Sequence, residues 1–342
     1  MRKPFALIAL GILTISCGTQ KPAKQPVKKA PTTVKTPTPA PKPKAEPVHK
    51  PKVQRQAGAE FFRENIANPD KNDNTASYGS IVTAETPGYK VVKDYFPAIA
   101  QNFRQRYIIL HYTALDHEKS VRVLTQQAVS AHYLVNELDD NEIYQLVDEN
   151  KRAYHAGISA WRNDRNLNDT SIGIEIVNAG YTTDASGTKI FTLFPPEQVD
   201  KVASLVKDLA ERYMIPATNI LGHSDIAPTR KQDPGPTFPW KQLYEKHQIG
   251  MWYDESTKDL FIQTAMTEDY VQQMTVPSFV FKIQTALRDF GYDVNPTGIY
   301  DDATKKTVEA FQYHFRPENY SGMVDAETWA ILQALLQKYP RK

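Results

Sequence analysis

Two histidines and one aspartate stand where they could hold a metal ion together. His111 and His223 each directly follow a short apolar run, and Asp233 comes ten residues after His223. Two imidazoles and one carboxylate suit a catalytic zinc ion, which keeps a fourth position open for water. Such an ion lowers the pKa of water and polarises a carbonyl group. The three residue types therefore indicate metal-assisted hydrolysis, with one zinc ion per chain.

Glu175 and Lys231 are the candidates for moving a proton and for stabilising negative charge. Glu175 lies inside the alternating apolar run 171–177, on the face opposite the isoleucines. An unpaired buried carboxylate is costly, so a glutamate there indicates a role as base. Lys231 precedes Asp233 by two residues and could stabilise an oxyanion. From these residues alone the alternative stays open, because a histidine at a strand end is more often a hydrogen-bonded structural residue.

Strands and helices that would position these side chains alternate along the chain. Residues 107–110 and 220–222 are short apolar runs that predict buried strands ending next to His111 and His223. Further strands are expected at 132–135, 143–147 and 171–177. Helices are expected around 121–128 and from 195 to 213, where apolar residues recur with helical spacing. Alternation of this kind predicts an α/β domain over 57–255, with its core at about 85–255.

The N-terminal 17 residues predict a lipoprotein signal peptide. Arg2 and Lys3 precede an apolar run from Phe5 to Ile15, which is shorter than the roughly 20 residues that a membrane-spanning helix needs. The following residues end at Cys17, the chain's single cysteine, and resemble a lipobox in which the cysteine is lipidated. We therefore expect a membrane-anchored lipoprotein, with an ordinary secretory signal as the alternative. Gly18 after Cys17 favours the outer membrane of a Gram-negative bacterium, facing the periplasm.

Residues 18–56 predict an extended, disordered linker. They contain nine lysines and Arg55 against Glu46, and nine prolines lie between Pro22 and Pro51. Such a segment cannot bury apolar surface and samples polyproline conformations. The whole chain carries a formal net charge of only +2, so the remainder is acidic and offers no case for nucleic-acid binding.

Several blocks around these residues resemble the zinc-dependent N-acetylmuramoyl-L-alanine amidases of the Amidase_2 family, in particular its outer-membrane lipoprotein amidases. The blocks are residues 109–114, 130–135, 155–157, 167–175, 222–228 and 230–236, together with Trp161. The resemblance implies a mixed central sheet flanked by helices. It also implies His111, His223 and Asp233 as zinc ligands, Glu175 as the catalytic acid–base and Lys231 as the transition-state stabiliser. The expected reaction is hydrolysis of the amide between N-acetylmuramic acid and L-alanine in peptidoglycan or muropeptides.

Four further residues in these blocks are candidates for substrate contact. They are His132, His155, Trp161 and Asn168. Aromatic faces and side-chain amides suit sugars and peptides. Hydrogen bonding to the backbone is the alternative for the histidines, and core packing is the alternative for Trp161. His49, His117, His247 and His314 fall outside the blocks and are expected to be surface residues.

A second, helical pattern occupies residues 276–340, after a predicted linker at 256–275. Residues 297–304 are echoed by residues 321–328, and each copy holds a glycine for a tight turn and an Asp before the next apolar run as a helix cap. This three-helix module resembles the peptidoglycan-binding domain 1 family, including the pair Phe311 and Gln312. The alternative is a helical subdomain that only braces the catalytic domain.

Two functions from other classes remain as alternatives to the enzyme. The first is a non-catalytic receptor that recognises peptidoglycan through the same groove, which loss of a zinc ligand would favour. The second is a lipoprotein that tethers membrane to wall through the C-terminal module. A monomer is expected.

Overall fold

The computed structural model describes residue 100 and residues 102–265 and 269–341. All of them belong to one compact unit, Val53–Lys342. The predicted signal peptide, Cys17 and the predicted linker 18–56 lie outside the described residues. Within the described part of the chain, no helix has the length and apolar character needed to cross a membrane.

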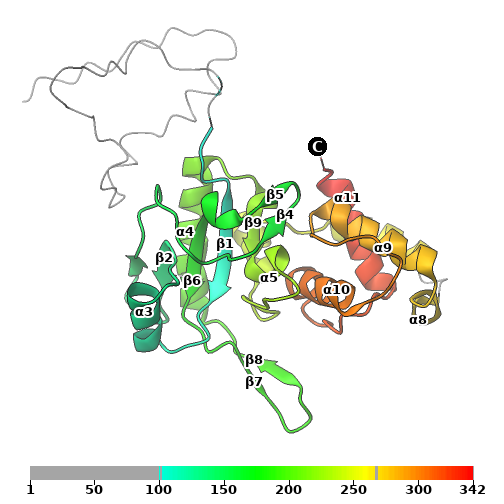
Figure 1. Cartoon of the computed structure of the whole chain (residues 1–342), viewed down its shortest axis with the longest axis horizontal. Coiled ribbons are helices and arrows are strands. Elements are labelled where there is room, and N and C mark those ends of the chain that lie inside the picture. Colours follow the sequence, from blue (N-terminus) through cyan, green and yellow to red (C-terminus); the bar gives the residue numbers. More distant parts are fainter. Residues whose placement is uncertain (1–99, 101, 266–268, 342) are drawn as a thin grey trace, which may run out of the picture. The chain divides into compact units, whose positions relative to one another are not determined.

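A five-stranded sheet forms the centre of the first domain, with strand order β3–β2–β6–β1–β9. The strands are β1 (Tyr107–Tyr112), β2 (Tyr133–Val135), β3 (Ile143–Gln145), β6 (Ser171–Ile176) and β9 (Ile220–Gly222). Four strands run parallel, and only β3 pairs antiparallel, with β2. The predicted α/β class with a mixed sheet is therefore confirmed, and Figure 1 shows β1 between β6 and β9.

Helices cover the sheet because each presents one apolar stripe. In α4 (Pro196–Tyr213) the buried face carries Val199, Val202, Val206 and Leu209, as the spacing predicts, and Pro196 stands in the first turn. These residues share one apolar cluster with Ile108 to Leu110 of β1. Helix α3 (His117–Gln126) begins at Asp116, whose side chain accepts a hydrogen bond from the Lys119 amide. Figure 1 shows α4 along one face of the sheet.

Two small hairpins were not predicted from the sequence. The strands β4 (Ala160–Trp161) and β5 (Asp164–Arg165) form one hairpin, and β7 (Tyr181–Thr183) and β8 (Lys189–Phe191) form the other. Strands of two or three residues are too short to show a period-2 pattern. Short 3-10 turns at Leu167–Asp169 and Ala217–Asn219, and helix α6 (Trp240–His247), complete this domain.

The C-terminal region contains the three predicted helices, α9 (Pro277–Phe290), α10 (Asp302–Phe315) and α11 (Ala326–Lys338). The side chains of Asp301 and Asp325 accept hydrogen bonds from the amides of Thr304 and Thr328, so both act as helix caps as predicted. Gln284 and Gln312 make equivalent hydrogen bonds. The side-chain oxygen of Gln284 accepts from the Gly298 amide, and that of Gln312 accepts from the Gly322 amide, each in the turn that follows its helix.

The prediction of a linker at 256–275 is wrong for most of the segment. Helix α7 (Glu255–Ala265) and the short α8 (Tyr270–Gln273) lie there. Helix α7 packs against α11, and Ala265 and Tyr270 are buried in the main apolar cluster. Three apolar residues of α7, Leu260 to Ile262, follow one another directly, so the sequence shows no helical spacing that would have predicted this helix.

Candidate active site

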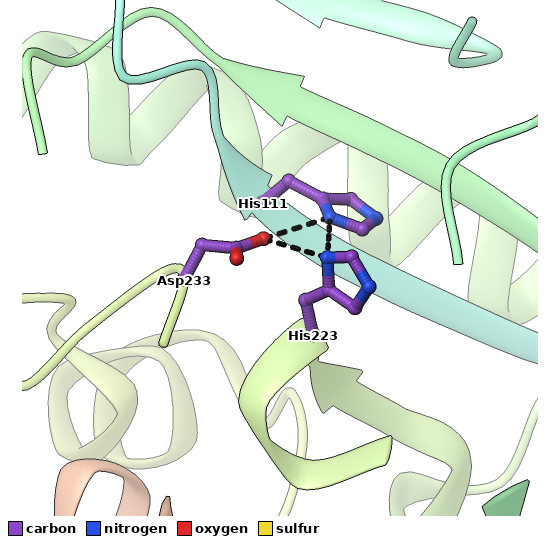
Figure 2. A group of neighbouring side chains, drawn as sticks. All are labelled: His111, His223 and Asp233. Carbon is purple, nitrogen blue, oxygen red and sulfur yellow. Dashed lines mark hydrogen bonds and ion pairs between the residues drawn. The ribbon is translucent and has the colours of Figure 1, made fainter. Parts of the chain in front are cut away.

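The three predicted metal ligands converge on one point. His111 Nδ1 lies 2.9 Å from His223 Nδ1 and 2.9 Å from Asp233 Oδ2, and His223 Nδ1 lies 3.0 Å from the same oxygen. All three residues are buried. Figure 2 shows the side chains pointing toward one another, with His111 on a strand, His223 at the start of a short helix and Asp233 on a loop.

The local fold explains why these residues meet. His111 lies in β1, and His223 begins the four-residue helix α5 (His223–Ile226) directly after the neighbouring strand β9. The loop that carries Asp233 returns to α5, where the Ser224 amide donates to the Asp233 carbonyl at 2.9 Å. A Cβ on Gly222 would lie 2.7 Å from Pro234 Cδ, so only glycine admits this close approach.

The hydrogen bonds on the far side of each imidazole decide where its protons lie. His223 Nε2 faces the Ala156 carbonyl at 3.1 Å and must donate to it. Ser171 Oγ donates to the Leu167 carbonyl and so accepts from His155 Nε2 at 3.1 Å. His155 Nδ1 therefore accepts from His111 Nε2 at 3.0 Å.

This proton order leaves the Nδ1 lone pairs of His111 and His223 facing the Asp233 carboxylate. Three acceptors within 3 Å of one another repel unless a cation lies between them. Burial lowers the pKa of His111 to about 4, with the charge of His223 in the same direction, so the imidazole is neutral at ordinary pH. Neutral imidazoles and a carboxylate are the donors that zinc takes. The site fits a divalent metal ion.

Glu175 and Lys231 line the same cleft as the three ligands. Glu175 Oε2 is buried and has no hydrogen-bond partner among the described residues. Burial raises the pKa of Glu175 to about 8, the charge of Asp233 acts in the same direction, and Lys231 opposes both. A carboxyl group with a pKa close to neutral is suited to taking and giving protons. The structure thus brings together all five residues predicted for metal binding and catalysis.

One wall of the cleft was missed by sequence reasoning. It is lined by Leu115, Val123 and Leu124 near and on α3, and by Val129 and Tyr154. Val129 is 47% exposed and Tyr154 is 54% exposed, so both present apolar surface to solvent at the cleft. An apolar wall of this kind is typical of a ligand cleft. Tyr154 directly precedes the family-like block 155–157, and this position is the signal that could have identified it.

The four predicted substrate contacts have different outcomes. The prediction is wrong for Trp161, whose side chain is 0% exposed because its indole packs against Phe290 and Tyr292. It is also wrong for His132, which is 0% exposed and bonded to the Gly173 amide and the Lys151 carbonyl. Both side chains lie in the interior, where substrate cannot reach them.

The other two predicted contacts support the site from beneath. Asn168 is buried, and its side-chain oxygen accepts the amides of His155 and Ala156. His155 lines the cleft, but both of its ring nitrogens are hydrogen-bonded, one to His111 and the other to Ser171. Burial, followed by the charge of His111, lowers the pKa of His155 well below its usual value. Asn168 thus holds the loop that carries His155, and His155 holds His111.

The predicted surface position is wrong for one histidine outside the family-like blocks. His314 was expected at the surface but is 1% exposed, because it stacks on Trp240 and Phe315 and bonds to Asp225. His117 and His247 keep partly exposed side chains beside Glu137 and Asp200. His49 lies outside the described residues.

Comparison with known families gives two matches along the chain. Residues 101–236 match Amidase_2, described as N-acetylmuramoyl-L-alanine amidase, and residues 277–332 match PG_binding_1, described as a putative peptidoglycan binding domain. Among curated proteins, the chain is 42% identical over 241 residues to the N-acetylmuramoyl-L-alanine amidase AmiD of Escherichia coli, covering 69% of this chain and 84% of that protein.

Solved structures agree with the sequence matches. A complex of AmiD from E. coli with the substrate anhydro-N-acetylmuramic acid-L-Ala-D-gamma-Glu-L-Lys is 40% identical, with a TM-score of 0.67, over 76% of this chain and 99% of that chain. The crystal structure of AmpDh3 from Pseudomonas aeruginosa is also 40% identical, with a TM-score of 0.62, over 76% of this chain and 100% of that chain.

Proposed function

The chain belongs to the N-acetylmuramoyl-L-alanine amidase family, and we propose on this basis that it performs the hydrolysis with one zinc ion and with Glu175 and Lys231 as its catalytic side chains. It is an amidase that acts on peptidoglycan or its muropeptide fragments. The bond it cleaves is the amide between the lactyl carbonyl of N-acetylmuramic acid and L-alanine. The convergence of five functional side chains in one cleft is the observation that carries the assignment of roles.

His111, His223 and Asp233 would hold the zinc ion. When bound, zinc polarises the scissile carbonyl and lowers the pKa of water at its open position. The rear hydrogen bonds from His111 to His155 and from His223 to the Ala156 carbonyl keep both Nδ1 atoms unprotonated and aimed at the metal.

Glu175 takes the proton from the attacking water and delivers it to the nitrogen of the departing alanine. It lies in β6, the strand adjacent to the strand of His111. This placement holds the carboxyl group beside the proposed metal ligands, although Glu175 is not itself a ligand. The raised pKa of about 8 favours the protonated form that donates to the amine, and the positive charges of Lys231 and a bound metal favour the ionised form that accepts from water.

Lys231 stabilises the negative charge that develops on the carbonyl oxygen. Its backbone amide donates to the carbonyl of Ala227, the residue directly after α5. This hydrogen bond fixes Lys231 relative to two proposed metal ligands, His223 at the start of α5 and Asp233 two residues after Lys231. A positive side chain at the rim of a partly desolvated cleft is worth more than one in bulk water.

The C-terminal module and the N-terminal segment would determine where the enzyme acts. We propose that the module also contacts the wall, which its match to a putative peptidoglycan binding domain supports. We also propose an anchor at Cys17, which is motivated by the lipobox-like residues before it. A receptor without activity is disfavoured, because each residue of the catalytic set is present in the cleft.

Metal content and product analysis test this proposal directly. Purified protein should hold one zinc ion per chain, and digestion of muropeptides should give products shortened by the whole stem peptide in mass spectra. His223→Ala and Asp233→Ala should lose the metal and the activity together. Full zinc occupancy in either variant, or cleavage that persists in the presence of a strong chelator, would refute the zinc assignment.

A further inference from the structure

Asp225 is a buried carboxylate that receives hydrogen bonds from two distant parts of the chain. It is 1% exposed, and Oδ2 accepts the amide of Gly222 at 2.8 Å. The other donors come from the C-terminal module: His314 Nδ1 at 2.8 Å and the Tyr292 hydroxyl at 2.7 Å. A buried polar group is costly unless it is hydrogen-bonded, so Asp225 depends on the module for two of its three hydrogen bonds.

Helix α5 is a single turn in which three consecutive residues make three different connections. His223 supplies Nδ1 to the metal site, the Ser224 amide holds the Asp233 carbonyl, and Asp225 reaches the module. A four-residue helix has almost no stability of its own. Its orientation must therefore come from these outside contacts, and two of the three ligands depend on that orientation.

The module presents its two donors rigidly. The His314 ring is stacked between Trp240 at 3.9 Å and Phe315 at 4.0 Å. The Tyr292 ring stands edge-on to Trp161, and a Cβ on the preceding Gly291 would lie 2.7 Å from the same indole. Neither donor can move away from Asp225 without breaking this packing.

Two other contacts between the module and the catalytic domain do not involve α5. Arg165 forms a two-pronged ion pair with Asp293, and the Lys338 side chain donates to Tyr244 at 2.8 Å. These contacts also dock the module, but neither reaches α5. They provide internal controls for docking without a connection to the ligands.

We propose that His314 and Tyr292 are positioning residues for the metal centre, so that the C-terminal module completes the active site by fixing α5 through Asp225. This inference rests on the proposed zinc site. It gives the module a role in the catalytic domain that is separate from wall binding. It also explains why a histidine outside every family-like block is buried with its Nδ1 aimed at the residue two positions after a ligand.

Two variants remove the donors while keeping the rings. His314→Phe retains the stacking surface and loses Nδ1, and Tyr292→Phe loses only the hydroxyl. In the full chain, the double variant should bind zinc at least tenfold more weakly in competition with a chromogenic chelator, since support groups behind ligands typically contribute about 10–100-fold. The visible spectrum of the cobalt-substituted protein should change, and kcat should fall more than KM rises.

Three comparison variants separate positioning from general stability. His314→Asn keeps a donor where Nδ1 lies and should restore most of the zinc affinity, even though it loses the stacking. Arg165→Ala and Lys338→Ala weaken docking at the same junction and should leave the cobalt spectrum and the zinc affinity at the parent values. Thermal unfolding of each variant reports the stability change on its own.

The outcomes are distinct. Parent zinc affinity and an unchanged cobalt spectrum in the folded double variant would overturn the inference, as would equal zinc loss in Arg165→Ala or Lys338→Ala at matched stability. Tyr292→Phe alone is mild enough to fold and should show a smaller change in the same direction. Failure of the proposed zinc site would give a different result from failure of this inference. The parent protein would then hold no zinc, or His223→Ala would retain it.

Discussion

His111 and Glu175 are register partners on the adjacent parallel strands β1 and β6. Parallel strands carry their successive residues in the same direction, so one pair of neighbours supplies both a proposed metal ligand and the proposed acid–base group at the same height of the sheet. The spacing between the His111 and Glu175 backbones is thus set by the hydrogen bonds between the two strands. This arrangement makes the effects of the two side chains separable by mutation.

Replacing Glu175 should abolish turnover without removing the metal. In Glu175→Ala the proton carrier is lost for both the attacking water and the leaving amine, so kcat should fall by about 10²–10⁴-fold. Zinc content measured by atomic absorption should stay at one per chain, and the KM for a muramyl peptide should change little. Cleavage within tenfold of the parent rate would exclude Glu175 as the acid–base.

Lys231 should matter for the transition state rather than for the metal. Lys231→Ala removes one positive group from the developing oxyanion, and kcat should fall by roughly 10²–10³-fold with zinc retained. Lys246→Ala, which removes an exposed lysine of α6, is the matched control and should keep the parent rate. A Lys231 variant that loses zinc would indicate a structural role for this side chain.

The raised pKa of Glu175 predicts a pH-dependent stability in the metal-free protein. Burial lifts the pKa from 4.5 in the unfolded chain to about 8, so the folded state keeps its proton longer. This group therefore reduces stability as pH rises from about 4.5 to about 8, by on the order of a few kcal/mol.

Glu175→Gln cannot ionise and should remove this loss. The variant should unfold in urea like the parent below pH 4.5 and become more stable than the parent above pH 8. Glu211→Gln, at an exposed position of α4, should show no such crossover. A constant difference between Glu175→Gln and the parent at every pH would contradict the raised pKa.

His155 should control metal affinity through His111. His155→Ala deprives His111 Nε2 of its acceptor, and zinc affinity should fall by about 10–100-fold. Gly173→Ala should act the same way, because a Cβ there would lie 2.4 Å from the His155 ring. His117→Ala, at the start of α3, serves as the control in the same chelator titration. Unchanged affinity in both His155→Ala and Gly173→Ala would leave His155 without a role at the metal.

The predicted anchor is tested by a single substitution. Cys17→Ser removes the acylation site and should release the protein into the soluble fraction of lysed cells, because acyl chains supply most of the membrane affinity of such a protein. Fractionation followed by immunoblotting measures this release. Unchanged sedimentation with membranes would require another tether.

The central part of the fold could be predicted because its signals are local. Apolar runs before His111 and His223 predict buried strands, and the strands end where chemistry is found. The alternating isoleucines around Glu175 predict the third strand of the site. Parallel pairing then brings these ends to one edge, so residue type and spacing made these residues candidates, and the resemblance to the family supplied their expected roles.

The errors concern residues whose environment is made by distant segments. His314 is buried by Trp240 and by Asp225, 89 residues earlier in the chain, and nothing near it in sequence indicates either contact. Trp161 is covered by Phe290 and Tyr292 for the same reason. Helix α7 was missed because its apolar residues Leu260 to Ile262 are consecutive rather than helically spaced, and its partner is α11. These features depend on how the C-terminal helices pack, and no local pattern encodes that packing.

The proposed metal ligands lie far apart in the sequence, so a bound ion would link distant parts of the chain. His111 and His223 lie 112 residues apart, yet their ring nitrogens are 2.9 Å apart beside the paired strands β1 and β9. A bound ion therefore acts as a removable cross-link, closing a loop that includes β2, β6 and α4. The unfolded chain has no such preformed site, so nearly all of the binding free energy becomes folding free energy. The free energy of unfolding of the proposed zinc enzyme would thus rise with the concentration of free zinc around it.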